Sequence, residues 1–199
     1  ITADAATTKL GPIAAGEASG KGEGNFYGVA VGPEGIYFSS NGDDTKGWIL
    51  RSKLKDGKPE ALEPYIATKP ATEVDAPVGI TMHPTKPFLV VGQMGEINKP
   101  KDGLLTFYRS TDGKMLMNLE TGLFDITALA YSPRARLYAL DYAWMDEKEG
   151  GLYRLDKTVD ENAKQGVTPV KVLPLDKATA MAFAPDGTLY VTVIGTKEE

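Results

Sequence analysis

Hydrophobic and polar residues alternate along most of this chain in short runs that are separated by turn residues. The run Tyr27–Val31 alternates up to Pro33, and the aromatic-rich run Ile36–Phe38 follows directly after Gly35. Alternation over such lengths is typical of half-buried β-strands joined by tight turns. No segment of ten or more residues shows a convincing helical period. The pattern therefore predicts an all-β chain.

The predicted strand pair recurs four times along the sequence, each time around a proline. In every copy a small residue precedes alternating apolar positions, and an apolar run follows the turn. The prolines lie 51, 49 and 52 residues apart, at Pro33, Pro84, Pro133 and Pro185. The small residues are Gly28, Gly79, Ala128 and Ala180. We expect small residues there because they let neighbouring inner strands approach closely around a central channel.

Two further strands follow in each of the first three copies. They are predicted at 48–53 and 61–66, at 104–109 and 115–119, and at 152–155 and 170–173, the last pair around a longer insertion. Four antiparallel strands repeated about every 50 residues are typical of β-propeller blades. The predicted blades are 24–74, 75–123, 124–175 and an incomplete 176–199. A β-sandwich or a solenoid is the alternative.

The repeat resembles NHL-repeat propellers and the group that includes gluconolactonases, senescence marker protein and strictosidine synthase. The resemblance covers about residues 24–195. It implies a six-bladed ring, so we favour a chain that forms part of such a ring over a small four-bladed one. The N-terminal segment 1–23 would supply an outer closing strand, for which residues 9–15 are the candidate.

The same resemblance implies a divalent metal held by acidic and amide side chains where the inner strands start. The matching positions here are Tyr27, Val78, Thr127 and Thr179, none of which is a carboxylate or an amide. A hard cation takes about six oxygen ligands. We therefore predict no cofactor and no such metal site on these blades, with Ca²⁺ at the loop rim as the one cation to consider.

The loops that leave the second strands carry the chemistry that the strand starts lack. Large aromatic residues in a loop are suited to anchor a partner. The predicted partner-binding residues are Asp141, Tyr142, Trp144, Asp146 and Glu147. The predicted cation or ligand rim comprises Asn41, Asp43, Asp44, Glu96 and Asp125, with Asp125 expected near Asp141. Ordinary solvated turns are the alternative for both sets.

Catalytic chemistry has little support in the residue inventory. The chain has no cysteine, and its single histidine, His83, occupies a turn position just before Pro84. Nucleophilic mechanisms that need a Ser–His or Cys–His pair are therefore disfavoured. A formal charge of −5 provides no footprint for nucleic acid. No apolar run approaches the roughly 20 residues of a membrane-spanning helix.

These observations predict a non-catalytic binding or scaffold module that engages a protein or peptide through its loop face, or serves as a subunit of a larger assembly. The alternative is a lactonase- or hydrolase-like enzyme with a divalent metal in the central channel. The start Ile1-Thr2-Ala3, without Met, slightly favours an exported protein that is periplasmic, lumenal or secreted. A start cut for convenience would look the same.

Overall fold

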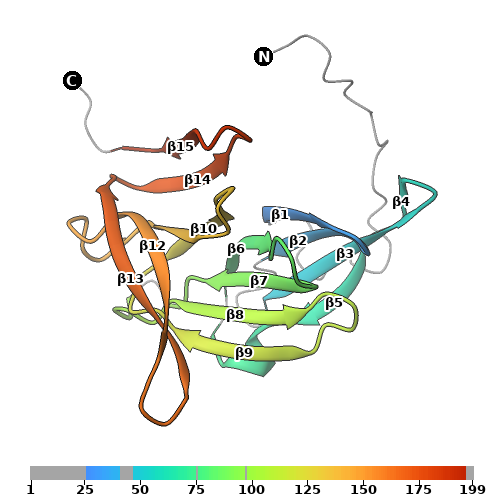
Figure 1. Ribbon diagram of the computed structural model, residues 1–199, viewed down its shortest axis with the longest axis horizontal. Coiled ribbons are helices and arrows are strands. Elements are labelled where there is room, and N and C mark those ends of the chain that lie inside the picture. The colour runs from blue at the N-terminus through green and yellow to red at the C-terminus, as the bar shows by residue number, and fades with distance from the viewer. Residues whose placement is uncertain (1–25, 41–46, 75, 97, 196–199) are drawn as a thin grey trace.

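In the computed structural model, residues 26–40, 47–74, 76–96 and 98–195 are described, and their strands form successive antiparallel sheets (Figure 1). The predicted N-terminal closing strand lies outside the described residues. The first strands of the sheets neighbour one another in chain order, β1 beside β6, β6 beside β10 and β10 beside β14. This is the arrangement of propeller blades around an axis, and the predicted all-β propeller fold is confirmed.

Blade 1 is a sheet in which β1 pairs with β2, β2 with β3, and β3 with both β4 and β5. The chain then forms one short helical turn, α1, and no helix among the described residues is long and apolar enough to cross a membrane. The elements are β1 (Phe26–Gly32), β2 (Gly35–Ser40), β3 (Trp48–Lys55), β4 (Lys58–Pro59), β5 (Glu63–Ala67) and α1 (Lys69–Thr72).

Blades 2 and 3 each contain four strands in sequential antiparallel order, as the repeat predicts. Blade 4 is described as a pair of strands. Blade 2 contains β6 (Pro77–Met82), β7 (Phe88–Gln93), β8 (Leu104–Arg109) and β9 (Met115–Glu120). Blade 3 contains β10 (Ile126–Tyr131), β11 (Leu137–Asp141), β12 (Gly151–Val159) and β13 (Gln165–Pro174). Blade 4 contains β14 (Ala178–Phe183) and β15 (Leu189–Val193).

The outer strands of blade 3 are longer than predicted. The expected insertion continues the β12–β13 ladder as far as the pair Val159 and Gln165, and this hairpin projects from the blade (Figure 1). The extra segment contains Thr158, Val159, Val167 and Thr168, whose β-branched side chains favour extended backbone. Asp160 makes the turn, because its carboxylate accepts the backbone N–H groups of Asn162 and Lys164, both at 2.9 Å.

Small residues at the strand starts are required by the close approach of neighbouring blades. A Cβ atom added at Gly28 would lie 2.6 Å from the carbonyl oxygen of Val78, on the next inner strand. The Ser39 hydroxyl also bridges the two blades, since it accepts the Gly28 N–H at 2.9 Å and donates to the Val78 carbonyl at 2.6 Å. The predicted role of the small residue is confirmed at this position.

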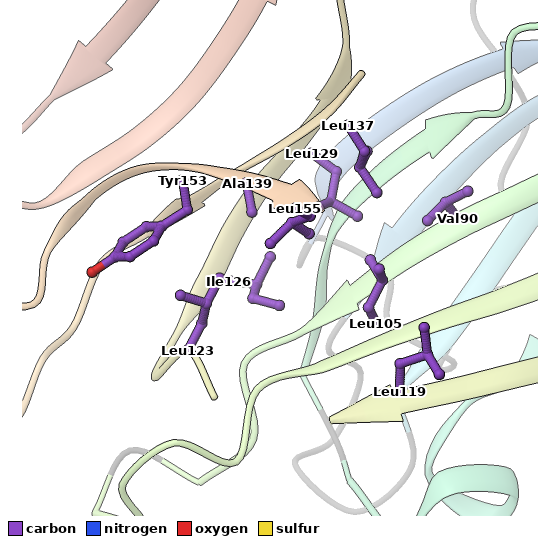
Figure 2. Packing of buried hydrophobic residues seen from close by; sticks show 10 residues of the cluster. All are labelled: Val90, Leu105, Leu119, Leu123, Ile126, Leu129, Leu137, Ala139, Tyr153 and Leu155. Atoms are coloured by element: carbon purple, nitrogen blue, oxygen red, sulfur yellow. The ribbon is translucent and has the colours of Figure 1, made fainter. Parts of the chain in front are cut away.

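The core lies between blades and is built from equivalent repeat positions. Figure 2 shows the largest cluster, in which Leu105 and Leu119 of blade 2 face Ile126 and Leu155 of blade 3. A second cluster joins blades 1 and 2 through Tyr37, Ile80 and Leu89, among others. Burying such faces against each other is the main favourable contribution to folding.

Among the described residues, the two outermost faces of the blade series carry exposed apolar side chains. Val29 of blade 1 is 60% exposed, whereas Ile80 at the same repeat position in blade 2 is 6% exposed. At the position that faces the following blade, Tyr190 of blade 4 is 65% exposed and Tyr37 of blade 1 is fully buried. The strand register makes these pairs equivalent, because Tyr37 opposes Ala30 just as Tyr190 opposes Ala182.

Candidate functional site at the channel mouth

The starts of the four inner strands converge on one pocket of about 350 Å³. They bring together Tyr27, Val78, Thr127 and Thr179, the residues at the positions where the resemblance implied metal ligands. Met94 completes this part of the wall, one residue beyond the end of β7. The repeat therefore supplies a shared cavity at the channel mouth, lined without carboxylate or amide groups at these positions.

The two threonines of the pocket turn their hydroxyl groups toward backbone and neighbouring side chains. The Thr127 hydroxyl donates to the carbonyl oxygen of Ala178 in the next blade at 2.8 Å. The Thr179 hydroxyl lies 2.9 Å from that of Thr192. With these hydrogen-bonding groups already engaged, the cavity presents a predominantly apolar wall.

Two aromatic side chains from the loop after β11 form the remaining wall. Tyr142 and Trp144 are stacked, with ring centroids 5.9 Å apart and planes inclined by 13°. Both line the pocket, and Trp144 is 55% exposed. An exposed tryptophan held over an apolar cavity offers a large contact area to whatever enters.

A fully buried carboxylate clamps the loop that carries these rings. Asp141, the last residue of β11, accepts backbone N–H groups from Phe124 at 2.9 Å, Asp125 at 2.7 Å and Ala143 at 3.1 Å. Ala143 adopts a left-handed backbone with φ of 49°, which is costly for a residue with a Cβ atom. Asp141 thus lies behind the surface, where it fixes the geometry of the aromatic pair.

Asp125 forms the second half of this clamp. Its carboxylate accepts the backbone N–H of Trp144 at 2.7 Å, and its backbone carbonyl accepts the backbone N–H of Tyr142 at 2.9 Å. Burial raises the pKa of Asp125 to about 6; the hydrogen bond from Trp144 lowers it, and the charges of Asp141 and Asp102 add to the increase. Burial also raises the pKa of Asp141, against the effect of its three N–H donors.

The other predicted residues that the structure describes, Asp146, Glu147 and Glu96, are exposed. Asp146 is exposed and accepts the Lys148 N–H at 3.1 Å within its own turn. Glu147 lies 3.7 Å from the Lys177 ammonium, which in turn is 6.0 Å from the Trp144 ring. Glu96 is exposed, and its backbone N–H donates to Asp102 at 3.1 Å. Asn41, Asp43 and Asp44 lie outside the described residues.

Within the described ranges, no three His, Cys, Asp or Glu side chains are grouped so that they could hold a metal ion. The two predicted rim residues that the structure describes have different roles. Asp125 supports the aromatic loop, whereas Glu96 is an exposed surface residue. The arrangement is suited to binding an apolar or aromatic group.

Sequence reasoning missed Met94 and Lys177 as parts of this site. Met94 could have been found, because it directly follows Gln93 at the exit of a second strand, where loop residues were expected to matter. Lys177 precedes β14 and gave no sequence signal beyond its charge.

The fold and the channel-mouth cavity together define a β-propeller, and the comparisons with known proteins agree at that level. No protein-family model and no curated protein matches the chain. Among solved structures, the chain is similar to a gluconolactonase of Xanthomonas campestris, with a TM-score of 0.56 and 14% identity over 87% of this chain and 57% of that one.

Two other solved structures are also similar to this chain. The Dos1 propeller matches with a TM-score of 0.54 and 12% identity over 84% of this chain and 42% of that one. Hydrazine synthase of Kuenenia stuttgartiensis matches with a TM-score of 0.51 and 13% identity, over 80% of this chain and 40% of that one. The chain spans less than two thirds of each of these structures. Such likeness establishes the fold alone, because proteins with one fold can have many different functions.

Proposed function

We propose that this chain is a non-catalytic β-propeller binding module, whose channel mouth receives an apolar or aromatic side chain of a protein or peptide partner. One observation carries the proposal: the stacked Tyr142 and Trp144 form one wall of the shared cavity at the inner-strand starts. Aromatic anchors in such pockets supply much of the binding energy of protein interfaces.

The rigid support of the loop favours this role. Asp125 and Asp141 together accept four backbone N–H groups through their carboxylates, and two of those groups belong to Ala143 and Trp144. A ring that is already in place loses little freedom when it binds, so more of the contact energy appears as affinity. The left-handed Ala143 is a second sign that the loop geometry is maintained at a cost.

The charges at the margin favour a partner that carries a basic residue beside its apolar one. Asp146 is exposed without an ion pair among the described side chains, whereas Glu147 is near Lys177. Opposite charge at an interface margin acts mainly on specificity and on the rate of association. In this proposal, Tyr142 and Trp144 make the contact, Asp146 and Glu147 select, and Asp141 and Asp125 position the loop.

The experiment is a selection of peptides from a random library on the immobilised protein, followed by affinity measurement. We expect the selected peptides to contain an aromatic or large aliphatic residue, and Trp144→Ala to weaken them by tenfold or more. Tyr190→Ala is the matched control, since Tyr190 is exposed but lies outside the pocket. Equal binding by wild-type and Trp144→Ala protein would refute the assignment.

The alternative, a lactonase- or hydrolase-like enzyme with a divalent metal in the channel, is tested with the same protein. Hydrolysis of a lactone or ester panel that requires a divalent cation and is abolished by EDTA would support it.

The proposal includes membership of the NHL-repeat and gluconolactonase-like group and a six-bladed ring. The proline repeat and the uncovered faces at Val29 and Tyr190 support these features.

A further inference from the structure

A second and larger hollow lies between blades 2 and 3, away from the channel mouth. This inter-blade groove has a volume of about 900 Å³, within the usual range of small-molecule sites. It is lined from the β6–β7 and β10–β11 turns to the start of β13, and so runs across the strands of both blades. Its position is where the core cluster between the two blades meets the surface.

Apolar side chains from both blades line much of the groove floor. Blade 2 contributes Phe88, Leu105, Phe107 and Met117, and blade 3 contributes Tyr131 and Leu155. Phe107, Met117 and Tyr131 are half-buried, so their rings and chains are partly open to the groove. A trough of this shape would take an elongated apolar group more readily than a compact one.

His83 helps to shape the inner end of the groove. Its ring lies 5.2 Å from that of Tyr131 and 5.8 Å from that of Phe88, measured between centroids. Its Nδ1 atom accepts the backbone N–H groups of Thr85 and Lys86, both at 3.2 Å. Burial, with a smaller effect of Lys86, lowers the pKa of His83. His83 is therefore a neutral turn residue that packs aromatic side chains.

The margin of the groove is positively charged, although the whole chain carries a formal charge of −5. Four cationic side chains line it, Lys86, Arg136, Arg154 and Lys157, against the single carboxylate of Asp156. Arg154 neutralises that carboxylate in an ion pair of 2.5 Å, and the charge of Arg136 also contributes to lowering the pKa of Asp156. Lys86, Arg136 and Lys157 form no ion pair of their own with the described residues.

We propose that the inter-blade groove binds a long-chain carboxylate, with its alkyl chain on the apolar floor and its head group at the cationic margin. The concave shape favours a small molecule over a protein surface, and the surplus of cations favours an anion. A small inorganic anion would make no contact with the apolar floor, and an uncharged lipid would not pair with the cationic side chains. Only an amphiphilic anion engages both parts of the groove.

The test is a calorimetric titration of the folded protein with octanoate, decanoate and dodecanoate, all below their micelle concentrations. Burial of the alkyl chain predicts tightening by up to about fourfold for each added methylene. Dodecyltrimethylammonium, which has the same chain and the opposite charge, should bind at least tenfold more weakly than dodecanoate. A flat chain-length series, equal binding of the cation or no binding of dodecanoate would each overturn the proposal.

Charge-reversal variants locate the site. The pair Arg136→Glu and Lys157→Glu should weaken dodecanoate by about tenfold or more, since each removes a hydrogen bond to a charged group. The matched control pair is Arg134→Glu and Lys164→Glu, two exposed residues near the same turn and hairpin that do not line the groove. Equal effects of both pairs, or loss of binding in Trp144→Ala, would place dodecanoate elsewhere and refute the groove.

Discussion

Ile80 and Val29 occupy the same position of the repeat, but their environments differ enough to give a sharp test of the blade packing. Ile80 is 6% exposed and packs against blade 1, whereas Val29 is 60% exposed. Ile80→Ala removes three buried carbon groups, or about 2–3 kcal/mol of transfer free energy, and the cavity raises the cost to about 3–4 kcal/mol. Val29→Ala removes two mostly exposed groups and should cost about 0.5 kcal/mol.

Urea denaturation followed by circular dichroism measures both costs in the same way. The slope of the free energy with urea must stay equal among wild type and variants for the comparison to hold. If Val29→Ala costs as much as Ile80→Ala, the outer face of blade 1 is covered in solution, in contrast to the 60% exposure of Val29. Repeating the Val29→Ala measurement at twentyfold dilution would then show whether a second molecule provides the cover.

Three further predictions use the same measurements. Asp125→Asn should flatten the pH dependence of the free energy of unfolding. Because the pKa of Asp125 is raised to about 6 in the folded protein, the folded state binds this proton more tightly than the unfolded state does. The stabilisation from this proton is therefore complete below about pH 4 and is lost as the pH rises through about 6. An unchanged pH dependence of stability in that variant would contradict this prediction. Gly28→Val should cost about 2 kcal/mol or more through overpacking, whereas Ala180→Val, at the equivalent but exposed position, should cost little. Thr127→Val should cost about 1 kcal/mol by removing a hydrogen bond between blades.

The fold could be predicted from the sequence because the same strand pattern occurs four times along the chain. The strand predicted at 104–109 coincides with β8, and the small residues at Gly28 and Gly79 lie where neighbouring strands nearly touch. The length of the β12–β13 hairpin was not predictable in this way. It belongs to one copy only, and its exposed strands lack the buried alternation that marks the others.

The candidate site was predictable in its parts but not in its roles. Strand pairing places Asp125 near Asp141, and the loop position of Tyr142 and Trp144 follows from the end of β11. The sequence does not reveal that Asp141 faces inward and accepts three N–H groups, because that depends on how the loop folds back over it. Whether a carboxylate is a contact or a support is decided by burial, and an isolated loop residue has no periodic pattern from which burial could be predicted.

The two proposed sites lie at opposite ends of β11, and this separation makes them independently testable. Arg136 precedes the strand, and Tyr142 follows it. Five residues of extended chain separate the two ends by about 13 Å or more. Substitutions at that distance, with no shared partner, usually have additive effects. A peptide at the channel mouth and a carboxylate in the groove should therefore bind together without competition.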